Sequence, residues 1–161
     1  MGPLPVCMGH LKIRSMMMNR MTWSLALVCF FLLPGCSSLM HPKADTFYHQ
    51  AKGDSGKQTA FNLLDMMDRS AQQARNEIGD SPGFQDLHNQ FHALHKSLCD
   101  FSETQSATTA YEHALTLNKE LKTVFHRLDK FKNDTALRAI HLDLFTSRLQ
   151  EFRAILQSIP S

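Results

Sequence analysis

Apolar residues recur every three or four positions through most of the C-terminal two-thirds of this chain. That spacing puts them on one face of an α-helix, and no segment alternates apolar and polar residues as a half-buried strand does. The stripes fall in the segments 60–78, 84–101, 114–131 and 137–159. In the last segment the predicted stripe is Leu137, His141, Leu144, Arg148 or Leu149, Phe152, Ile155 and Ile159. The pattern predicts an all-α fold.

Turn and capping residues separate these segments and leave only short connections between them. The signals are Gly79 as a helix C-cap, Ser81-Pro82 as an N-cap followed by proline, Thr109 with Glu112 as a capping box, and Asn133-Asp134 as another N-cap. Short connections make consecutive helices antiparallel neighbours. We therefore predict one helical domain over 56–161, an up-down-up-down four-helix bundle.

Near the N-terminus, the residues Leu33-Pro34-Gly35-Cys36 close an apolar run that begins at Ser24. Arg20 gives the positive charge that precedes such a run in a secretory signal peptide. The run is too short to cross a bilayer comfortably, since crossing takes about 20 residues. The segment resembles the signal peptide and lipobox of bacterial lipoproteins, in which a peptidase cuts before the cysteine and a diacylglycerol is joined to its sulfur. Pro34 departs from the family pattern, which usually has Ala, Ser or Thr there.

The resemblance implies that 1–35 are removed and that Cys36 is lipidated, so that acyl chains such as palmitate hold the protein on a membrane. Four methionines, Met16, Met17, Met18 and Met21, are alternative starts, which would make 1–15 an over-extended start. Ser37 follows the cysteine, where aspartate would imply the inner membrane, so the resemblance implies the periplasmic face of the outer membrane. An uncleaved N-terminal anchor is the alternative.

The segment 36–55 has little periodicity, which predicts a flexible, lipid-anchored tether. The alternative is that its aromatic pair Phe47-Tyr48 docks on the helical domain.

Removal of 1–35 also changes the net charge, because the loss of Lys12, Arg14 and Arg20 leaves 14 of the 17 basic residues against 15 acidic ones. A near-neutral domain lacks the concentrated basic face that nucleic acid binding needs.

The second helical segment carries His88, His92, His95 and Cys99 on one stripe beside its apolar face. Imidazole nitrogen and thiolate are ligands that zinc and copper prefer, so the stripe is a candidate metal site. A further ligand would come from another helix, with His126 and His141 as candidates. The alternative is that the histidines occupy the edge of the core and Cys99 is a small buried residue. Processing would leave no second cysteine for an intramolecular disulfide with Cys99, so an intermolecular partner is a third option.

The sequence has no Gly-x-Ser-x-Gly, no His-Glu-x-x-His and no glycine-rich phosphate loop, so we expect a non-catalytic protein. The leading hypothesis is a lipid-anchored helical module that binds a protein partner in the cell envelope. In outline it resembles secretin pilotins and immunity proteins against periplasmic toxins. Zinc or copper binding by the His/Cys stripe is the alternative function. Candidate partner contacts, with a wider core face as their alternative, are Phe61, Leu63, Leu115, Phe125, Leu142 and Phe145.

Overall fold

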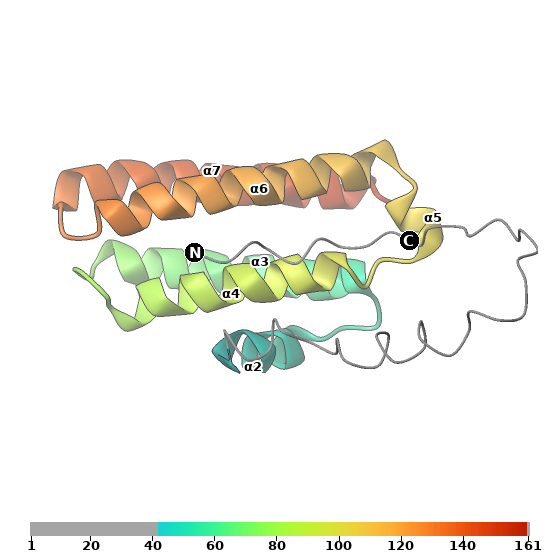
Figure 1. Ribbon diagram of the computed structural model, residues 1–161, viewed down its shortest axis with the longest axis horizontal. Coiled ribbons are helices and arrows are strands. Elements are labelled where there is room, and N and C mark those ends of the chain that lie inside the picture. The colour runs from blue at the N-terminus through green and yellow to red at the C-terminus, as the bar shows by residue number, and fades with distance from the viewer. Residues whose placement is uncertain (1–41, 161) are drawn as a thin grey trace, which may run out of the picture. The chain divides into compact units, whose positions relative to one another are not determined.

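The computed structural model describes residues 42–160, of which 81% are helical and none lies in a strand. The helices are α2 (Pro42–Ala51), α3 (Gly56–Arg75), α4 (Pro82–Leu98), α5 (Glu103–Ser106), α6 (Thr109–Lys130) and α7 (Thr135–Ser158) (Figure 1). The predicted all-α class is confirmed over these residues. The predicted signal peptide, Cys36 and the tether up to 41 lie outside them.

Each of the four long helices packs against two others: α3 contacts α4 and α7, and α6 contacts the same two helices. The start of α3 meets the end of α4, where a Cβ on Gly56 would lie 2.7 Å from the carbonyl carbon of Asp100. At the other end, a Cβ on Gly83 would lie 2.9 Å from the backbone nitrogen of Ala74. The two helices are therefore antiparallel.

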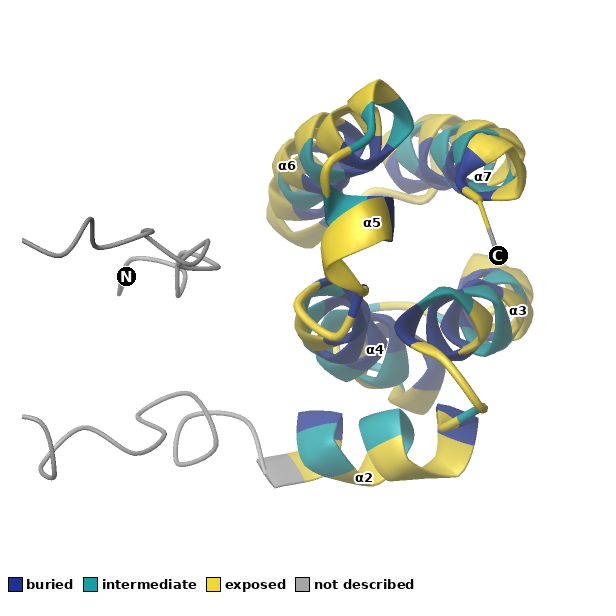
Figure 2. Cartoon of the chain, turned by 90° about the vertical axis from the view of Figure 1, so that its right-hand side faces the viewer, coloured by how far each residue is buried: buried dark blue, intermediate teal, exposed yellow. Residues whose placement is uncertain are grey.

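The buried sides of the four long helices face one another, and their exposed sides face outward (Figure 2). Large side chains with almost no exposed surface come from all four helices, so a shared core holds them together. These residues are Leu63, Leu64 and Met67 of α3, Leu87, Leu94 and Leu98 of α4, Leu121 and Leu128 of α6, and Leu142, Phe145, Leu149 and Phe152 of α7.

Side-chain oxygens cap the first turns of these helices. Ser81 accepts a hydrogen bond from the Phe84 backbone N–H, and Asp134 accepts one from the Leu137 N–H. Each such cap contributes about 1 kcal/mol. The cap of α6 is Thr108, which accepts from the Tyr111 N–H, so the prediction of Thr109 as the cap, with Glu112 completing a capping box, is wrong.

The end of α3 differs from the prediction. The helix stops at Arg75, and Gly79 lies in the following turn with a φ of 71°, in the left-handed region that favours glycine. There its N–H donates to the Lys132 carbonyl over 3.3 Å. Ile78 therefore leaves the helix and is 66% exposed, instead of continuing the core stripe.

The prediction of a flexible tether over 36–55 is wrong over Pro42–Ala51, which forms α2. Phe47 and Tyr48 are half-buried against the core, as the docking alternative expected. The Tyr48 hydroxyl donates to Asp100, and Lys96 lies 4.3 Å above the Tyr48 ring. These contacts with the rest of the domain stabilise α2, which is too short to be stable in isolation.

The stripe predicted for the last helix is also wrong in part. Leu137 and Leu144 point to solvent, and His141 is only half-buried. The residues that α7 buries are Arg138, Leu142, Phe145, Leu149, Phe152 and Leu156. The prediction is therefore wrong in the first half of α7, whereas Leu149, Phe152 and Ile159 of the predicted stripe are buried.

Within 42–160, no helix combines the length and apolar content that crossing a membrane requires.

Candidate functional site

The predicted His/Cys stripe lies on α4 and at its C-terminal end, where His88, His92 and His95 are half-buried and Cys99 is the C-cap residue. His88 and His92 approach each other closely, with 3.2 Å between their Nε2 atoms. The His88 ring makes a T-shaped contact with the ring of Phe125 from α6, with 5.2 Å between centroids. His92 makes a similar T-shaped contact with Phe91 at 5.6 Å. Two imidazoles of the stripe thus form a pair held by aromatic neighbours.

The other two members of the stripe have different surroundings. The Asn118 amide nitrogen lies 2.9 Å from His95 Nδ1, so a buried residue of α6 occupies that ring nitrogen. Cys99 is disulfide-bonded. The expectation that Cys99 lacks an intramolecular disulfide partner concerned the chain without 1–35 and with a lipid on Cys36, and it stays a prediction.

The structure therefore does not bring the predicted metal ligands into one cluster. Among residues 42–160, no three His, Cys, Asp or Glu side chains are placed to share an ion. His141 stacks on Phe131 with 5.4 Å between ring centroids, and its Nδ1 is buried. His126, the other candidate ligand, is exposed on α6.

A second candidate site is an exposed apolar row on α7, formed by Leu137, Ile140 and Leu144, which we call the outer row. These side chains are 36%, 60% and 37% exposed. Their i, i+3, i+7 spacing aligns them along one side of the helix, about 120° around its axis from the buried residues. The α7 helix thus presents apolar residues both to the core and to solvent.

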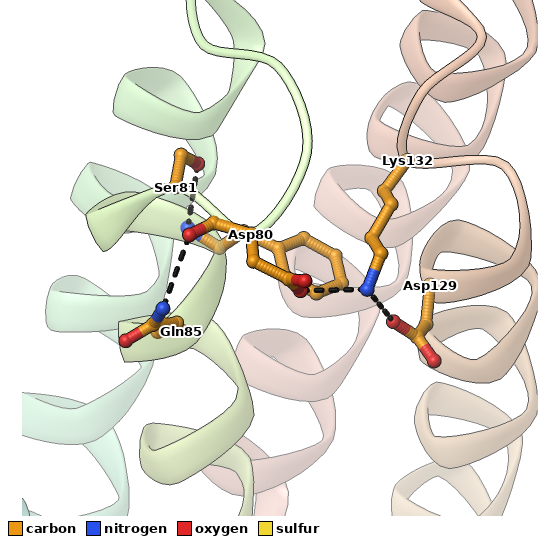
Figure 3. A network of polar contacts seen from close by, with 6 residues as sticks. Asp80, Ser81, Gln85, Asp129 and Lys132 are labelled. Atoms are coloured by element: carbon orange, nitrogen blue, oxygen red, sulfur yellow. Dashed lines mark hydrogen bonds and ion pairs between the residues drawn. The ribbon is translucent and has the colours of Figure 1, made fainter.

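The adjacent turns are tied together at the end of the molecule where the outer row begins. Lys132 Nζ lies 2.6 Å from Asp80 and 3.1 Å from Asp129 (Figure 3). The Gly79 N–H also donates to the Lys132 carbonyl. The turn that holds the exposed Ile78 is thereby held beside the turn that leads into α7.

Ion pairs lie beside the outer row and leave it between charged groups. Asp143 pairs with Arg75 of α3 at 2.5 Å. Arg148 pairs with Glu151 at 2.5 Å and with Glu120 of α6 at 3.6 Å. The outer row therefore has ion-paired side chains close to it on the same helix.

The partner contacts predicted from the sequence are not on the surface. Four of them are buried in the core, and the remaining two are half-buried against it. The buried ones are Leu63, Phe125, Leu142 and Phe145, and the half-buried ones are Phe61 and Leu115. The sequence signal for the outer row was present, because Leu137, Ile140 and Leu144 form a second helical row between the positions that the core uses.

No family model, curated protein or solved structure matches this chain.

Proposed function

We propose that this chain is a non-catalytic lipoprotein, held by a lipid on Cys36 at the periplasmic face of the outer membrane. Its four long helices form an up-down-up-down bundle, and the outer row of α7 binds an amphipathic helix of a protein partner in the cell envelope. The exposed outer row is the observation that carries the binding proposal.

The order of contacts along the helices supports the bundle. Asp65 of α3 pairs with Arg153 near the end of α7, whereas Arg75 at the end of α3 pairs with Asp143 near the start of α7. Contacts that run in opposite directions along two helices require an antiparallel pair. The short connection 131–134 gives α6 and α7 the same relation.

The spacing of the outer row supports a helical partner. Three apolar side chains at i, i+3 and i+7 form a straight ridge, and a helix with a matching apolar stripe packs beside such a ridge. Leaving Ile140 in water forgoes the stabilisation that its burial would give, about 25 cal/mol for each Å² covered. A partner helix recovers that free energy on binding.

The lipobox residues 33–36 support the anchor, and Ser37 supports the outer membrane. Three acyl chains, the number usual in this class, exceed the two membrane signals that stable anchoring requires. The near-neutral mature domain supports a protein partner over a nucleic acid.

Site-specific photocrosslinking in intact cells tests the binding proposal. A photoreactive amino acid replaces Ile140 in one variant and Glu112, an exposed residue of α6, in the control. We expect one dominant adduct with another envelope protein from position 140 and none from position 112. Adding Leu144→Asp to the first variant removes that adduct, because a charge on the ridge opposes apolar packing.

Three outcomes contradict the binding proposal. Equal adducts from positions 140 and 112 would mean unspecific contact, and no adduct from position 140 would mean an unoccupied row. An adduct of twice the chain's own mass that contains only this chain would assign the row to a second copy.

Cell fractionation tests the anchor separately. The Cys36→Ser variant loses the sulfur that carries the lipid, so we expect it to move from the outer-membrane fraction to the soluble periplasmic fraction or to remain unprocessed in the inner membrane. The Ser37→Ala variant keeps the lipobox cysteine and remains in the outer membrane. Unchanged outer-membrane retention of Cys36→Ser would contradict lipid anchoring.

A further inference from the structure

The two imidazoles of His88 and His92 are separated by the distance that two ligands of one metal ion show. Their Nε2 atoms are 3.2 Å apart. In a tetrahedral site with metal–nitrogen distances of 2.0–2.1 Å, two ligand nitrogens lie about 3.3 Å apart. Residues four apart on a helix share one side of it, which allows both rings to face a common point.

We propose that His88 and His92 bind one Zn²⁺ ion through their Nε2 atoms and that His95 and Cys99 take no part. Zinc matches the site because imidazole nitrogen is one of its preferred ligands and it imposes little geometry of its own. The two remaining tetrahedral positions are filled by water, since among residues 42–160 no third ligand group stands beside the pair.

The contacts around the pair hold the rings for binding. The Phe125 ring meets His88 edge to face, and Phe91 does the same for His92, so the imidazole planes are set by packing. The two imidazole planes are inclined at 32° to each other, and their ring centroids are 5.0 Å apart. Preset rings lose little side-chain entropy when an ion binds.

The proton balance of the pair is simple. Without metal, one Nε2–H donates to the other ring's Nε2, so one ring carries its proton on Nε2 and the other on Nδ1. Zinc needs a lone pair on both Nε2 atoms. The donating imidazole therefore transfers its proton to its own Nδ1 through water, and binding releases no net proton from two neutral rings.

His95 bonds to Asn118, whereas His88 and His92 lie against each other, so a variant at His95 is a matched control for the pair. Asn118 approaches its Nδ1 at 2.9 Å, and Asn118 is 1% exposed, so this ring is held toward α6. The structure thus divides the stripe predicted from the sequence into one chelating pair and one histidine that bonds across the helix interface.

Calorimetric titration of the full chain in detergent with Zn²⁺ tests the proposal. We expect a binding step whose affinity falls by at least about a hundredfold in His88→Ala and in His92→Ala, because removing one ligand abolishes chelation. His95→Ala and the exposed His113→Ala keep the wild-type affinity. Far-UV circular dichroism without zinc checks that each variant is folded, and His88→Gln and His92→Gln replace the alanine variants if those unfold.

A thermal melt gives a second readout. Zn²⁺ raises the melting temperature of the wild type and of His113→Ala but leaves that of the His88→Gln, His92→Gln double variant unchanged. Wild-type zinc affinity in the single pair variants would overturn the proposal, as would a hundredfold loss in His95→Ala. The proposed partner-binding row lies on α7 and uses neither histidine, so either proposal can fail alone.

Discussion

The two apolar rows of α7 have nearly the same composition and opposite surroundings. Leu142, Phe145 and Leu149 have no exposed surface, whereas Ile140 is 60% exposed on the same helix. Residue type therefore does not separate a buried position from an exposed one here. What separates them is which side α3 and α6 cover, and the covered side is bordered by ion pairs to both helices.

The largest expected effect on the free energy of unfolding comes from one of two neighbouring alanine substitutions, and comparing the two tests this difference. Phe145→Ala removes a fully buried ring and leaves a cavity, so we expect the free energy of unfolding to fall by about 3–5 kcal/mol. Leu144→Ala, one residue earlier on the outer row, changes it by no more than about 1 kcal/mol. Denaturant unfolding of the full chain measures both, and similar losses would mean that the outer row is also packed.

A second test concerns the ion pairs that border the covered side of α7. Arg153 contacts Asp68 at 2.7 Å, and both side chains are about four-fifths covered. We expect Asp68→Ala to cost about 1–2 kcal/mol, because it leaves the Arg153 guanidinium with Asp65 alone in a half-buried site. Asp143→Ala removes a carboxylate that is far more exposed and costs less than about 1 kcal/mol. Equal losses in denaturant unfolding would contradict a special role for the covered pair.

A third test extends the comparison to α2, which is attached through polar contacts at its edge. The hydrogen bond to Asp100 raises the pKa of Tyr48 to about 12. The unfolded chain ionises this phenol near pH 10, so the stabilisation is complete below pH 10 and is lost as the pH rises toward 12.

In Tyr48→Phe that loss is absent, so we expect the stability difference between wild type and variant, below about 1 kcal/mol, to shrink over pH 10–12. Denaturant unfolding at pH 9 and pH 11.5 measures it. A difference that stays constant with pH would mean that the phenol does not bond to Asp100 in solution.

The substitution with the smallest expected effect on stability, Ile140→Asp, is also the sharpest test of whether the outer row is exposed and binds a partner. Ile140→Asp adds a charge to a side chain that already faces water, so the free energy of unfolding changes by no more than about 0.5 kcal/mol. The crosslink from a photoreactive residue at position 137 to the envelope partner nevertheless disappears. Loss of stability as large as that of Phe145→Ala would show that position 140 belongs to the core.

Several elements could be predicted from local patterns. The caps Ser81 and Asp134 depend on side chains that bond to backbone within the same turn, so nearby sequence contains all the information. The apolar stripe predicted within 84–101 is buried at Phe84, Leu87 and Phe91 because that helix has a single apolar face. The sequence put His88, His92 and His95 on one stripe of α4, but the separation of these residues into a close pair and a histidine that bonds to Asn118 depends on the packing of α6.

The sequence by itself determined that the chain is helical over the described residues and where α4 and α7 begin, because helical periodicity and capping are local properties. The sequence also contains Leu33-Pro34-Gly35-Cys36, and the resemblance of these residues to a lipobox does not depend on the fold. Only the tertiary structure decided which row of α7 is buried, that residues 42–51 form a helix, and that Asn118 bonds to His95. Each of these depends on a neighbour distant in sequence, since burial and polar pairing are set by what packs against a residue and not by the residue's own type.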